Sequence, residues 1–356
     1  MARNPLRVAV IGYGLAGAGL HAPLISSTPG MAVAAVVTSD AGRSKRARSE
    51  FPDAEVVARA DDLWGNAGDL DLVVVAAPNR AHAPLAEASL RAGVPVVVDK
   101  PLATTAADAR GLTELSRETG VMLSVFHNRR WDDDFRTLRR LAEGGTLGPI
   151  ARLESRFERY RPEVAADRWR ESPAPEEGGG LLFDLGSHLI DQALVLFGAP
   201  THVYAEIERR RPGAQVDDDT FVALRFADGA SAHLWANQVT IDPGPRFRAA
   251  GLRGVFESNG LDPQEDALRS GLRPGDSGWG ERPEDAWPRL SVWADGAPTQ
   301  KRVRTERGAY EAFYAGVRDA LLENVNPPVT AEEGLRVIEV IEAARTSAAD
   351  RTVVAF

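Results

Sequence analysis

The chain has 356 residues, of which 44% are hydrophobic and 26% are charged, with a net charge of −9 at pH 7 and no cysteine. This composition predicts a soluble globular protein of two domains, each able to bury a sizeable core. The negative charge argues against a general nucleic-acid binder or a binder of anionic membranes, since both need a basic face, and the lack of cysteine excludes disulfides, thiolate chemistry and cysteine metal sites.

The N-terminal residues show no targeting signal. Residues 1–5 lead directly into a strand pattern, without the apolar core and small-residue cleavage site of a signal peptide. The longest apolar runs, such as 70–78, are too short to span a bilayer. We therefore expect a cytoplasmic protein that contacts neither a membrane nor nucleic acid.

Strand-like and helix-like segments alternate through the first third of the chain. Short, nearly continuous apolar runs, which suit strands covered on both faces, occupy residues 6–11, 32–37, 70–77, 94–98 and 121–126. Helical patterns lie between them, at residues 15–28, 43–51, 81–92 and 105–119. This alternation predicts an α/β fold, a doubly wound parallel sheet of the Rossmann type, over residues 1–125.

A glycine-rich turn follows the first strand and opens the first helix. It reads Gly12-Tyr13-Gly14-Leu15-Ala16-Gly17, a G-x-G-x-x-G in the context that the motif requires. The first glycine permits the tight turn, the second lets the backbone approach a pyrophosphate, and the third allows the helix to pack closely on the strand. We predict that a dinucleotide binds here, at Gly12, Tyr13, Gly14, Leu15 and Gly17. The alternative is that these glycines only shape a turn.

The end of the second strand indicates which dinucleotide binds. An acidic side chain there would bond the 2′-hydroxyl of NAD, but the strand is followed by Thr38 and Ser39, and then by Arg43. Hydroxyls and an arginine suit a 2′-phosphate, so Thr38, Ser39 and Arg43 predict NADP. NAD is the alternative if Asp40 reaches the ribose. A further alternative is that Asp40 caps the next helix and the basic residues form a solvated face.

Polar residues also follow two later strands. Pro78 and Asn79 come after the run at 70–77, where an asparagine can bond the nicotinamide ribose or amide. His82 begins the next helix and is predicted to lie near the cofactor, with a purely structural role as the alternative. Asp99 and Lys100 end the run at 94–98. Of the 42 basic residues only Lys45, Lys100 and Lys301 are lysines, and a partly buried lysine can exchange a proton where an arginine cannot.

A second dense signal lies on a helix entered through Gly178-Gly179-Gly180 and continuing to Phe197. Asp184, His188 and Asp191 stand at i, i+4 and i+7, which places them on one helix face. A carboxylate one turn from an imidazole can fix its tautomer and raise its basicity, as in acid/base pairs. No further histidine stands at metal-site spacing, so we predict no metal. The alternative is a satisfied core histidine.

The pattern then changes to strands without intervening helices. Strand-like segments at 203–209, 220–226 and 230–235, the last two joined by a hairpin signal, predict a second, mostly antiparallel α+β domain over residues 126–356. Asp217-Asp218-Asp219 is interpreted as a solvated lead-in to a strand, and residues 262–298 as long loops. Helices follow at 310–324 and 331–344, and a helix over 331–350 could pack back on the first domain.

Four features in order resemble the Gfo/Idh/MocA oxidoreductases: the glycine turn with His21-Ala22-Pro23, Pro78-Asn79-x-x-His82, Asp99-Lys100-Pro101, and Asp184-x-x-x-His188. The family usually has Glu-Lys-Pro, so Asp99 departs from it by one methylene. The resemblance implies a Rossmann domain followed by a domain with an open, mostly antiparallel sheet that often forms the subunit contact. It therefore implies a homodimer or homotetramer, and it implies that Lys100, Asp184 and His188 converge near the nicotinamide.

Segments 124–132, 160–163 and 260–268 resemble a narrower branch, the NADP-dependent scyllo-inositol 2-dehydrogenases. The substrate implied is a secondary alcohol of a cyclitol or sugar. In the predicted mechanism His188 is the general base, Asp184 orients it, and Lys100 stabilises the developing alkoxide or relays the proton. The reverse assignment, with lysine as base, stays open.

Four residues are candidates for the polyol site, because they could bond ring hydroxyls or pack on ring C–H groups: Arg129, Trp131, Tyr160 and Arg161. For Trp131 a core role is the alternative. Two other functions stay open for the fold: a glycosidase that keeps NAD bound and oxidises its substrate transiently, and a non-catalytic sensor of a sugar or dinucleotide that binds a protein partner.

Overall fold

The computed structural model describes residues 5–65, 67–164, 171, 177–294 and 296–356. The chain forms two compact units, each described here by itself. The first consists of Met1–Asn128, Gln264–Trp279 and Ala309–Leu335. The second consists of Arg129–Pro263, Gly280–Gly308 and Arg336–Phe356. The compact units are thus discontinuous in sequence, and the single boundary between residues 125 and 126 stays a prediction for separately folding domains.

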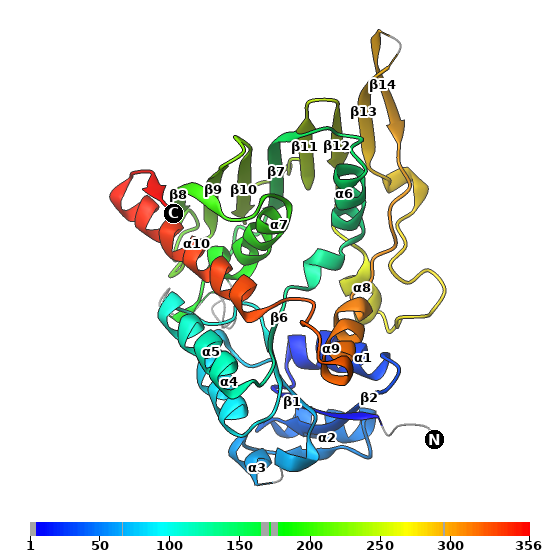
Figure 1. Cartoon of the computed structure of the whole chain (residues 1–356), viewed down its shortest axis with the longest axis vertical. Helices are drawn as coiled ribbons and strands as arrows, with labels where there is room; N and C mark the ends of the chain where they lie inside the picture. Colours follow the sequence, from blue (N-terminus) through cyan, green and yellow to red (C-terminus); the bar gives the residue numbers. More distant parts are fainter. Residues whose placement is uncertain (1–4, 66, 165–170, 172–176, 295) are drawn as a thin grey trace. The chain divides into compact units, whose positions relative to one another are not determined.

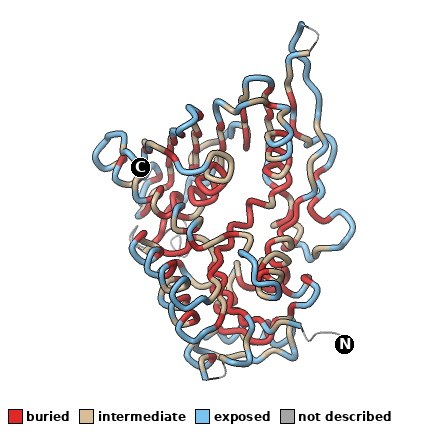
Figure 2. The backbone as a smooth tube through the Cα atoms, in the orientation of Figure 1, coloured by how far each residue is buried: buried red, intermediate tan, exposed pale blue. Residues whose placement is uncertain are grey.

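The first unit is built on a six-stranded sheet in the order β3-β2-β1-β4-β5-β6, with every pair parallel. Its central strands are buried on both faces, as their continuous valine-rich runs require, and they form the red centre of this unit in Figure 2. The predicted doubly wound sheet is confirmed. The strands are β1 (Leu6–Ile11), β2 (Met31–Val37), β3 (Glu55–Val57), β4 (Leu72–Val75), β5 (Val96–Asp99) and β6 (Leu123–Phe126).

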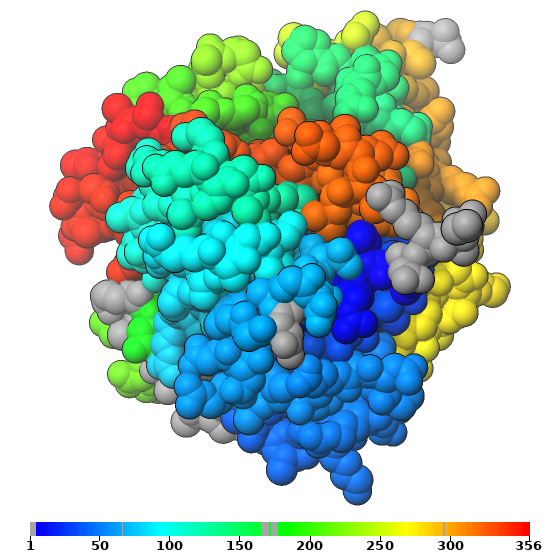
Figure 3. All heavy atoms as spheres, turned by 60° about the horizontal axis from the view of Figure 1, so that its bottom comes forward, coloured from blue at the N-terminus to red at the C-terminus, as the bar shows by residue number. Residues whose placement is uncertain are grey.

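Helices connect these strands, and their caps follow the side-chain chemistry of the sequence. Thr105 caps α5 by accepting from the Asp108 N–H, and Gly120 ends that helix at a φ of 68°. Figure 3 shows the blue to cyan residues of this unit as one continuous surface. The helices are η1 (Gly17–His21), α1 (Ala22–Ser26), α2 (Ala41–Glu50), α3 (Asp61–Trp64), η2 (Ala67–Asp69), η3 (Asn79–Ala81), α4 (His82–Arg91), α5 (Ala106–Thr119), α8 (Gln264–Arg269) and α9 (Glu311–Glu323).

The second unit contains a nine-stranded sheet in the order β14-β13-β12-β11-β7-β10-β9-β8-β15, in which β7 and β10 pair in parallel and all other neighbours are antiparallel (Figure 1). This confirms the open, mostly antiparallel sheet. The strands are β7 (Ile150–Glu158), β8 (Pro200–Glu208), β9 (Asp219–Phe226), β10 (Ser231–Asn237), β11 (Phe247–Gly251), β12 (Gly254–Ser258), β13 (Arg289–Ala294), β14 (Ala297–Arg302) and β15 (Val354–Ala355).

Residues 262–298 are not all loop, and that prediction was wrong in part. They include α8, η7 (Glu284–Ala286) and β13, and β14 begins at Ala297. Many glycines and prolines surround these elements, and only Leu290 of β13 is buried, so the strand shows no clear alternation of buried and exposed positions. Pairing with β12, rather than local sequence, defines β13 as a strand.

Helices cover one face of the nine-stranded sheet. Helix α7 (Ser187–Phe197), which continues η6 (Leu182–Gly186), packs on β7 and β10. Helix α6 (Asp133–Glu143) precedes β7, and η4 (Asn128–Trp131) spans the unit boundary in sequence. Helix α10 (Ala331–Asp350) begins in the first unit and belongs to the second from Arg336 onward. Among the described residues, no helix combines the length and apolar composition needed to cross a membrane.

Candidate functional site

The glycine turn between β1 and η1 has the geometry of a dinucleotide-binding loop. Gly12 has a φ of 95°, and a Cβ there would lie 2.4 Å from the Ala76 carbonyl oxygen. A Cβ on Gly17 would lie 1.9 Å from the Gly12 carbonyl oxygen. Both positions therefore need glycine, one for conformation and one for close packing of helix on turn. A side chain at Gly14 would meet only the Arg43 guanidinium within 4 Å, so the turn leaves room for a pyrophosphate.

The two side chains between these glycines point in different directions. Tyr13 is buried, and its hydroxyl donates to Glu50 of α2. Leu15 is 64% exposed. The turn therefore offers a ligand its backbone at Tyr13, not the phenol.

At the end of β2, the Asp40 carboxylate caps α2 by accepting from the Arg43 N–H at 2.7 Å. The predicted capping by Asp40 is thereby confirmed, whereas the role of the basic residues stays a prediction. The Arg43 side chain is exposed and its guanidinium lies beside Gly14. Thr38 is partly exposed and Ser39 exposed. The structure therefore brings the Arg43 guanidinium to the turn, while the Asp40 carboxylate already has a backbone partner.

At the end of β4, Pro78 is exposed and Asn79 is buried. His82 is also buried, with Nδ1 2.7 Å from the Pro101 carbonyl oxygen and Nε2 2.9 Å from the Ala77 carbonyl oxygen. Burial lowers the pKa of His82. The imidazole thus links the segment after β4 to the segment after β5.

The predicted catalytic lysine follows β5, where the Lys100–Pro101 peptide is cis. The Lys100 N–H donates to Asp99 Oδ1 at 2.9 Å, and His21 Nε2 lies 3.8 Å from the same oxygen. Burial opposes ionisation of Asp99, but His21, Lys100 and His82 outweigh it and lower the pKa of the carboxyl to about 2. Asp99 is therefore ionised, and its carboxylate lies next to Lys100, whose backbone N–H it binds.

In the second unit, Asp184 lies in the π-helical turn η6, and His188 in the first turn of α7. His188 is 5% exposed, and its ring meets Phe157 edge to face, with 6.4 Å between ring centroids. Asp184 is less buried than its neighbours. The structure thus keeps both residues on consecutive turns of one continuous helix.

Asp191, the third acid of that helix, has a different role. Its carboxylate accepts from Arg130 Nε at 2.9 Å and from Arg130 Nη2 at 2.6 Å, and both side chains are buried. This bidentate pair ties η4 to α7 and leaves Asp184 and His188 as the candidate acid/base pair.

The helix that carries Asp184 begins at the Asp217 carboxylate, which the sequence pattern had placed in a solvated segment. Asp217 Oδ2 accepts from the Leu182 N–H at 2.8 Å, and Asp218 is fully buried and paired with Arg211 Nε at 2.8 Å. The interpretation of residues 217–219 as a solvated lead-in was therefore wrong, because Asp218 is fully buried and Asp217 is partly buried against the start of the helix. Burial raises the pKa of Asp217 to about 6, against the effect of the backbone N–H groups that it accepts from.

Of the four candidate polyol residues, Arg129 is the most enclosed. Its guanidinium lies over the Phe157 ring at 4.8 Å, and its backbone oxygen accepts from Gln192 at 2.8 Å. Arg246, which the sequence did not indicate, also lies over the Phe157 ring, 4.0 Å from its centroid, and donates to Gln192 at 2.8 Å. Two cationic groups thus hold Phe157 next to His188.

Trp131 is partly exposed at the end of η4, whereas Tyr160 is 52% exposed and Arg161 exposed. The backbone of this last segment is fixed, because the Arg161 N–H donates to the Gln238 carbonyl oxygen at 2.8 Å and buried Arg211 donates to the Arg161 carbonyl oxygen at 3.2 Å. Arg211 is a second supporting residue that local sequence did not reveal.

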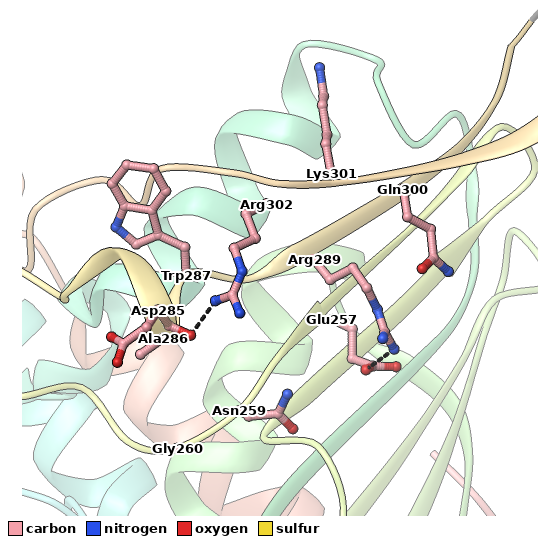
Figure 4. A pocket seen from close by; sticks show the side chains of 10 residues that line it. All are labelled: Glu257, Asn259, Gly260, Asp285, Ala286, Trp287, Arg289, Gln300, Lys301 and Arg302. Carbon is pink, nitrogen blue, oxygen red and sulfur yellow. Dashed lines mark hydrogen bonds and ion pairs between the residues drawn. The ribbon is translucent and has the colours of Figure 1, made fainter.

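A cavity of about 480 Å³ lies elsewhere in the second unit, beside β12, η7 and β14 (Figure 4). Its arginines are engaged: Arg289 pairs with Glu257 at 2.5 Å, and Arg302 donates to the Asp285 carbonyl oxygen. None of the predicted site residues lines it. Within the described part of the chain, no group of three or more His, Cys, Asp or Glu residues could hold a metal ion.

The predicted residues thus fall into two groups. The first unit brings together the glycine turn, Arg43 and, after β5, Asp99 and Lys100. The second unit holds the helix with Asp184 and His188 and the four candidate polyol residues. The convergence of Lys100 with Asp184 and His188 beside a nicotinamide stays a prediction.

Two family descriptions match the chain. "Oxidoreductase family, NAD-binding Rossmann fold" matches residues 6–127, and "Oxidoreductase family, C-terminal alpha/beta domain" matches residues 139–356. Each bears the Gfo/Idh/MocA name.

Individual proteins are similar over nearly the whole length. The uncharacterized oxidoreductase YdgJ of Escherichia coli is 40% identical over 97% of each chain. The scyllo-inositol 2-dehydrogenase (NADP(+)) IolW of Bacillus subtilis is 36% identical over 98% of this chain and 95% of its own. The solved structure of the oxidoreductase YvaA of Bacillus subtilis superposes with a TM-score of 0.93 at 33% identity, over 100% of this chain and 99% of that one. The chain therefore belongs to the Gfo/Idh/MocA oxidoreductase family, and its residues 6–127 form an NAD(P)-binding Rossmann domain.

Proposed function

We propose that the chain is an NADP-dependent dehydrogenase that oxidises a secondary alcohol of a cyclitol or sugar, of the scyllo-inositol kind, to the ketone. The observation that carries this proposal is the full-length similarity to a scyllo-inositol 2-dehydrogenase that uses NADP(+). The glycine turn supports it, because backbone contacts require glycine at positions 12 and 17 and the turn leaves room for a pyrophosphate at Gly14.

The preference for NADP rests on the surroundings of Arg43. Its guanidinium lies beside Gly14, whereas the Asp40 carboxylate is occupied by a backbone N–H. An exposed arginine with neighbouring hydroxyls can bind a 2′-phosphate by charge-assisted hydrogen bonds. A capping carboxylate is poorly placed to select the 2′-hydroxyl of NAD.

In the proposed reaction, NADP bound at the glycine turn would supply the acceptor for the hydride that leaves the carbinol carbon. His188 takes the hydroxyl proton, Asp184 orients the imidazole, and Lys100 stabilises the developing alkoxide. Tyr160 and Arg161 are exposed on a segment with a fixed backbone, and with Trp131 and Arg129 they form the proposed polyol site. Arg129 mainly supports the position of the other residues in this proposed site, because its guanidinium stacks on Phe157.

We also propose that the chain forms a homodimer or homotetramer through the nine-stranded sheet. The ring centroids of Phe221 on β9 and Trp235 on β10 lie 5.1 Å apart, and both side chains are only partly buried in the single chain. A second copy of the chain could cover them. Light scattering of the purified protein tests this directly, and a monomer at micromolar concentration would contradict it.

The experiment that tests the function is a screen of cyclitols and aldoses with both coenzymes, followed at the absorbance band of reduced nicotinamide. The proposal expects net NADPH formation with at least one cyclitol, and slower turnover with NAD. Release of free sugar from glycosides without net reduction would instead identify a redox glycosidase. Binding of a sugar without turnover of any substrate would identify a sensor.

A further inference from the structure

We propose that the cavity beside β12, η7 and β14 binds a small anionic carbohydrate, a sugar phosphate or a sugar acid, with its anionic group on the Arg302 guanidinium. The cavity lies within the second unit, and none of the residues assigned above to the coenzyme or the polyol lines it. It is therefore a site separate from the proposed dehydrogenase reaction. Its volume of about 480 Å³ is that of a small-molecule site.

A row of charged side chains crosses the nine-stranded sheet and ends in this cavity. Residues directly opposite one another on β7, β11, β12, β13 and β14 are, in that order, Glu154, Arg248, Glu257, Arg289 and Arg302. Arg248 lies 3.5 Å from Glu154 and 3.8 Å from Glu257. Arg289 lies 2.5 Å from Glu257. The first four charges alternate in sign and therefore balance one another within the protein.

Arg302 breaks this alternation, because it places a second cation directly opposite Arg289. Like charges directly opposite each other on neighbouring strands are destabilising, and an anion between them would relieve the repulsion. The two carboxylates that line the cavity do not balance Arg302: Glu257 pairs with Arg289, and the Asp285 carboxylate points away from Arg302 in Figure 4. Among the described residues, Arg302 forms no ion pair. The row thus ends in a positive charge that a bound anion can balance.

The Arg302 guanidinium is oriented through one of its nitrogens. Nη1 donates to the carbonyl oxygens of Glu284, at 3.1 Å, and of Asp285. Nε and Nη2 have no partner in the described part of the chain. Arg130 and Arg282 use this same edge, Nε with Nη2, to bind carboxylates elsewhere in the protein. The edge of Arg302 can therefore bind two oxygens of a phosphate or carboxylate.

Side-chain amides lie around this guanidinium. Figure 4 shows Gln300 and Arg302 on one side of β14 and Lys301 on the other, with Asn259 across the cavity. Neither the Gln300 nor the Asn259 amide has a hydrogen-bond partner among the residues that the structure describes. An amide carries both donors and an acceptor, so it can bond the hydroxyls of a sugar. An anion that also carries hydroxyls therefore matches this lining better than a bare anion or a neutral sugar.

Buried Arg282 holds the walls of the cavity together. Its Nη1 donates to the Asn259 carbonyl oxygen at 2.6 Å, and its own carbonyl oxygen accepts from Trp287 Nε1 at 3.1 Å. Its Nε donates to Asp133 of α6 at 2.6 Å. One buried ion pair thus fixes both segments that line the cavity, 259–260 and 285–287, so the site is preformed.

Isothermal titration calorimetry of the full-length protein tests the site with glucose 6-phosphate, gluconate, glucose and inorganic phosphate. We expect glucose 6-phosphate or gluconate to bind with a Kd below about 1 mM and at least about tenfold tighter than inorganic phosphate. The tighter of the two distinguishes a sugar phosphate from a sugar acid. Arg302→Gln should weaken its binding roughly 10- to 100-fold, the loss expected for hydrogen bonds between charged groups, and should leave any binding of uncharged glucose unchanged.

Two further variants give the test a direction and a control. Glu257→Gln removes the carboxylate that pairs with Arg289, so it should strengthen binding of the anionic sugar several-fold, which mere damage to the structure would not do. Arg304→Gln changes an exposed arginine that follows β14 and does not line the cavity. It is the matched control and should leave binding unchanged.

Binding of neither anionic sugar at about 10 mM would overturn the inference. Equal effects of Arg302→Gln and Arg304→Gln would also overturn it, as would binding that Glu257→Gln fails to strengthen. Inorganic phosphate bound as tightly as the anionic sugars would contradict a carbohydrate ligand. A protein that forms NADPH from a cyclitol but binds neither anionic sugar would keep the proposed function and lose this site, so the two failures are distinguishable.

Discussion

Asp217 is a single carboxylate on which the helix carrying Asp184 and His188 begins. A Cβ at Gly180, whose φ is 92°, would lie 1.9 Å from Asp217 Oδ1, so the chain must turn closely around the carboxylate. The Asp217 carbonyl oxygen and carboxylate accept from the first two N–H groups of the helix. Burial and capping act in opposite directions on its ionisation, and burial is the larger.

The burial of Asp217 makes the stability of the protein depend on pH. The pKa of Asp217 is about 6 in the folded chain, above the value of about 3.9 in an unfolded chain, so the folded chain holds the proton more tightly. Its contribution to stability is complete below about pH 4 and is lost as the pH rises through 6. We expect the free energy of unfolding of the parent, relative to Asp217→Asn, to fall by up to about 3 kcal/mol over this range. Urea denaturation at both ends of the range measures it, and a difference that does not change with pH would contradict the assignment.

Arg43 is the residue on which coenzyme choice depends. Arg43→Ala should weaken NADPH binding roughly 10- to 100-fold, the loss expected for hydrogen bonds to a charged group, and should change NADH binding little. Lys45→Ala, an exposed residue of the same helix, is the matched control. Fluorescence titration with both reduced coenzymes measures the affinities, and equal losses for the two would show that Arg43 does not contact the 2′-phosphate.

At the scale of elements, the turn between β1 and η1 is held by backbone packing. Gly17→Ala would push a methyl group against the Gly12 carbonyl oxygen, whereas Gly19→Ala meets nothing within 4 Å. We expect Gly17→Ala to lower the thermal midpoint and to abolish coenzyme binding. Gly19→Ala should bind normally and be slightly more stable, since alanine costs less entropy in a helix. Coenzyme binding by Gly17→Ala at the parent's affinity would mean that the turn can rearrange.

A buried ion pair joins α6 to the segment before η7. Arg282 Nε donates to Asp133 at 2.6 Å, its Nη2 lies 3.8 Å from Asp134, and its Nη1 donates to the Asn259 carbonyl oxygen at 2.6 Å. Burial and the neighbouring Asp133 raise the pKa of Asp134. The buried Arg282 guanidinium, together with the charge of Arg246, therefore balances a pair of adjacent carboxyls.

Arg282→Met should destabilise the protein by roughly 3–5 kcal/mol, because it leaves buried carboxylates without their partner. Arg289→Ala is the control, since it removes a largely exposed partner of Glu257 and should cost less than about 1 kcal/mol. Chemical denaturation of both variants compares the losses. Losses of similar size would show that the buried pair contributes no more than an exposed one.

At the scale of the molecule, sequence predicts an element well where its hydrophobic pattern is complete within the element. The central strands of the parallel sheet are apolar on both faces and were located within a few residues, as were α5 and α9. By contrast, β3 has three residues and β14 is exposed throughout. Such strands are defined by the neighbours with which they pair, and no local pattern reveals them.

The candidate site shows the same difference between residues found by a local pattern and residues defined by distant partners. The glycine turn, Lys100 and the pair Asp184 and His188 could be located, because motifs at strand ends and helical spacing are local. The supporting groups are joined to them across long stretches of sequence: His21 contacts Tyr314, and Arg211 contacts the segment of Arg161. Their roles depend on burial and on a partner, neither of which a single sequence displays.

The central claim is that Lys100 serves hydride transfer from a polyol to NADP. It is tested most directly by measuring NADPH formation from scyllo-inositol and related cyclitols for the parent and for Lys100→Ala, with NADP binding to each protein determined in parallel. The account predicts turnover by the parent, a loss of about 100-fold or more in kcat for the variant, and NADP affinities within a few-fold of each other. Equal turnover by the two proteins, or no NADPH from any cyclitol with the parent, would contradict it.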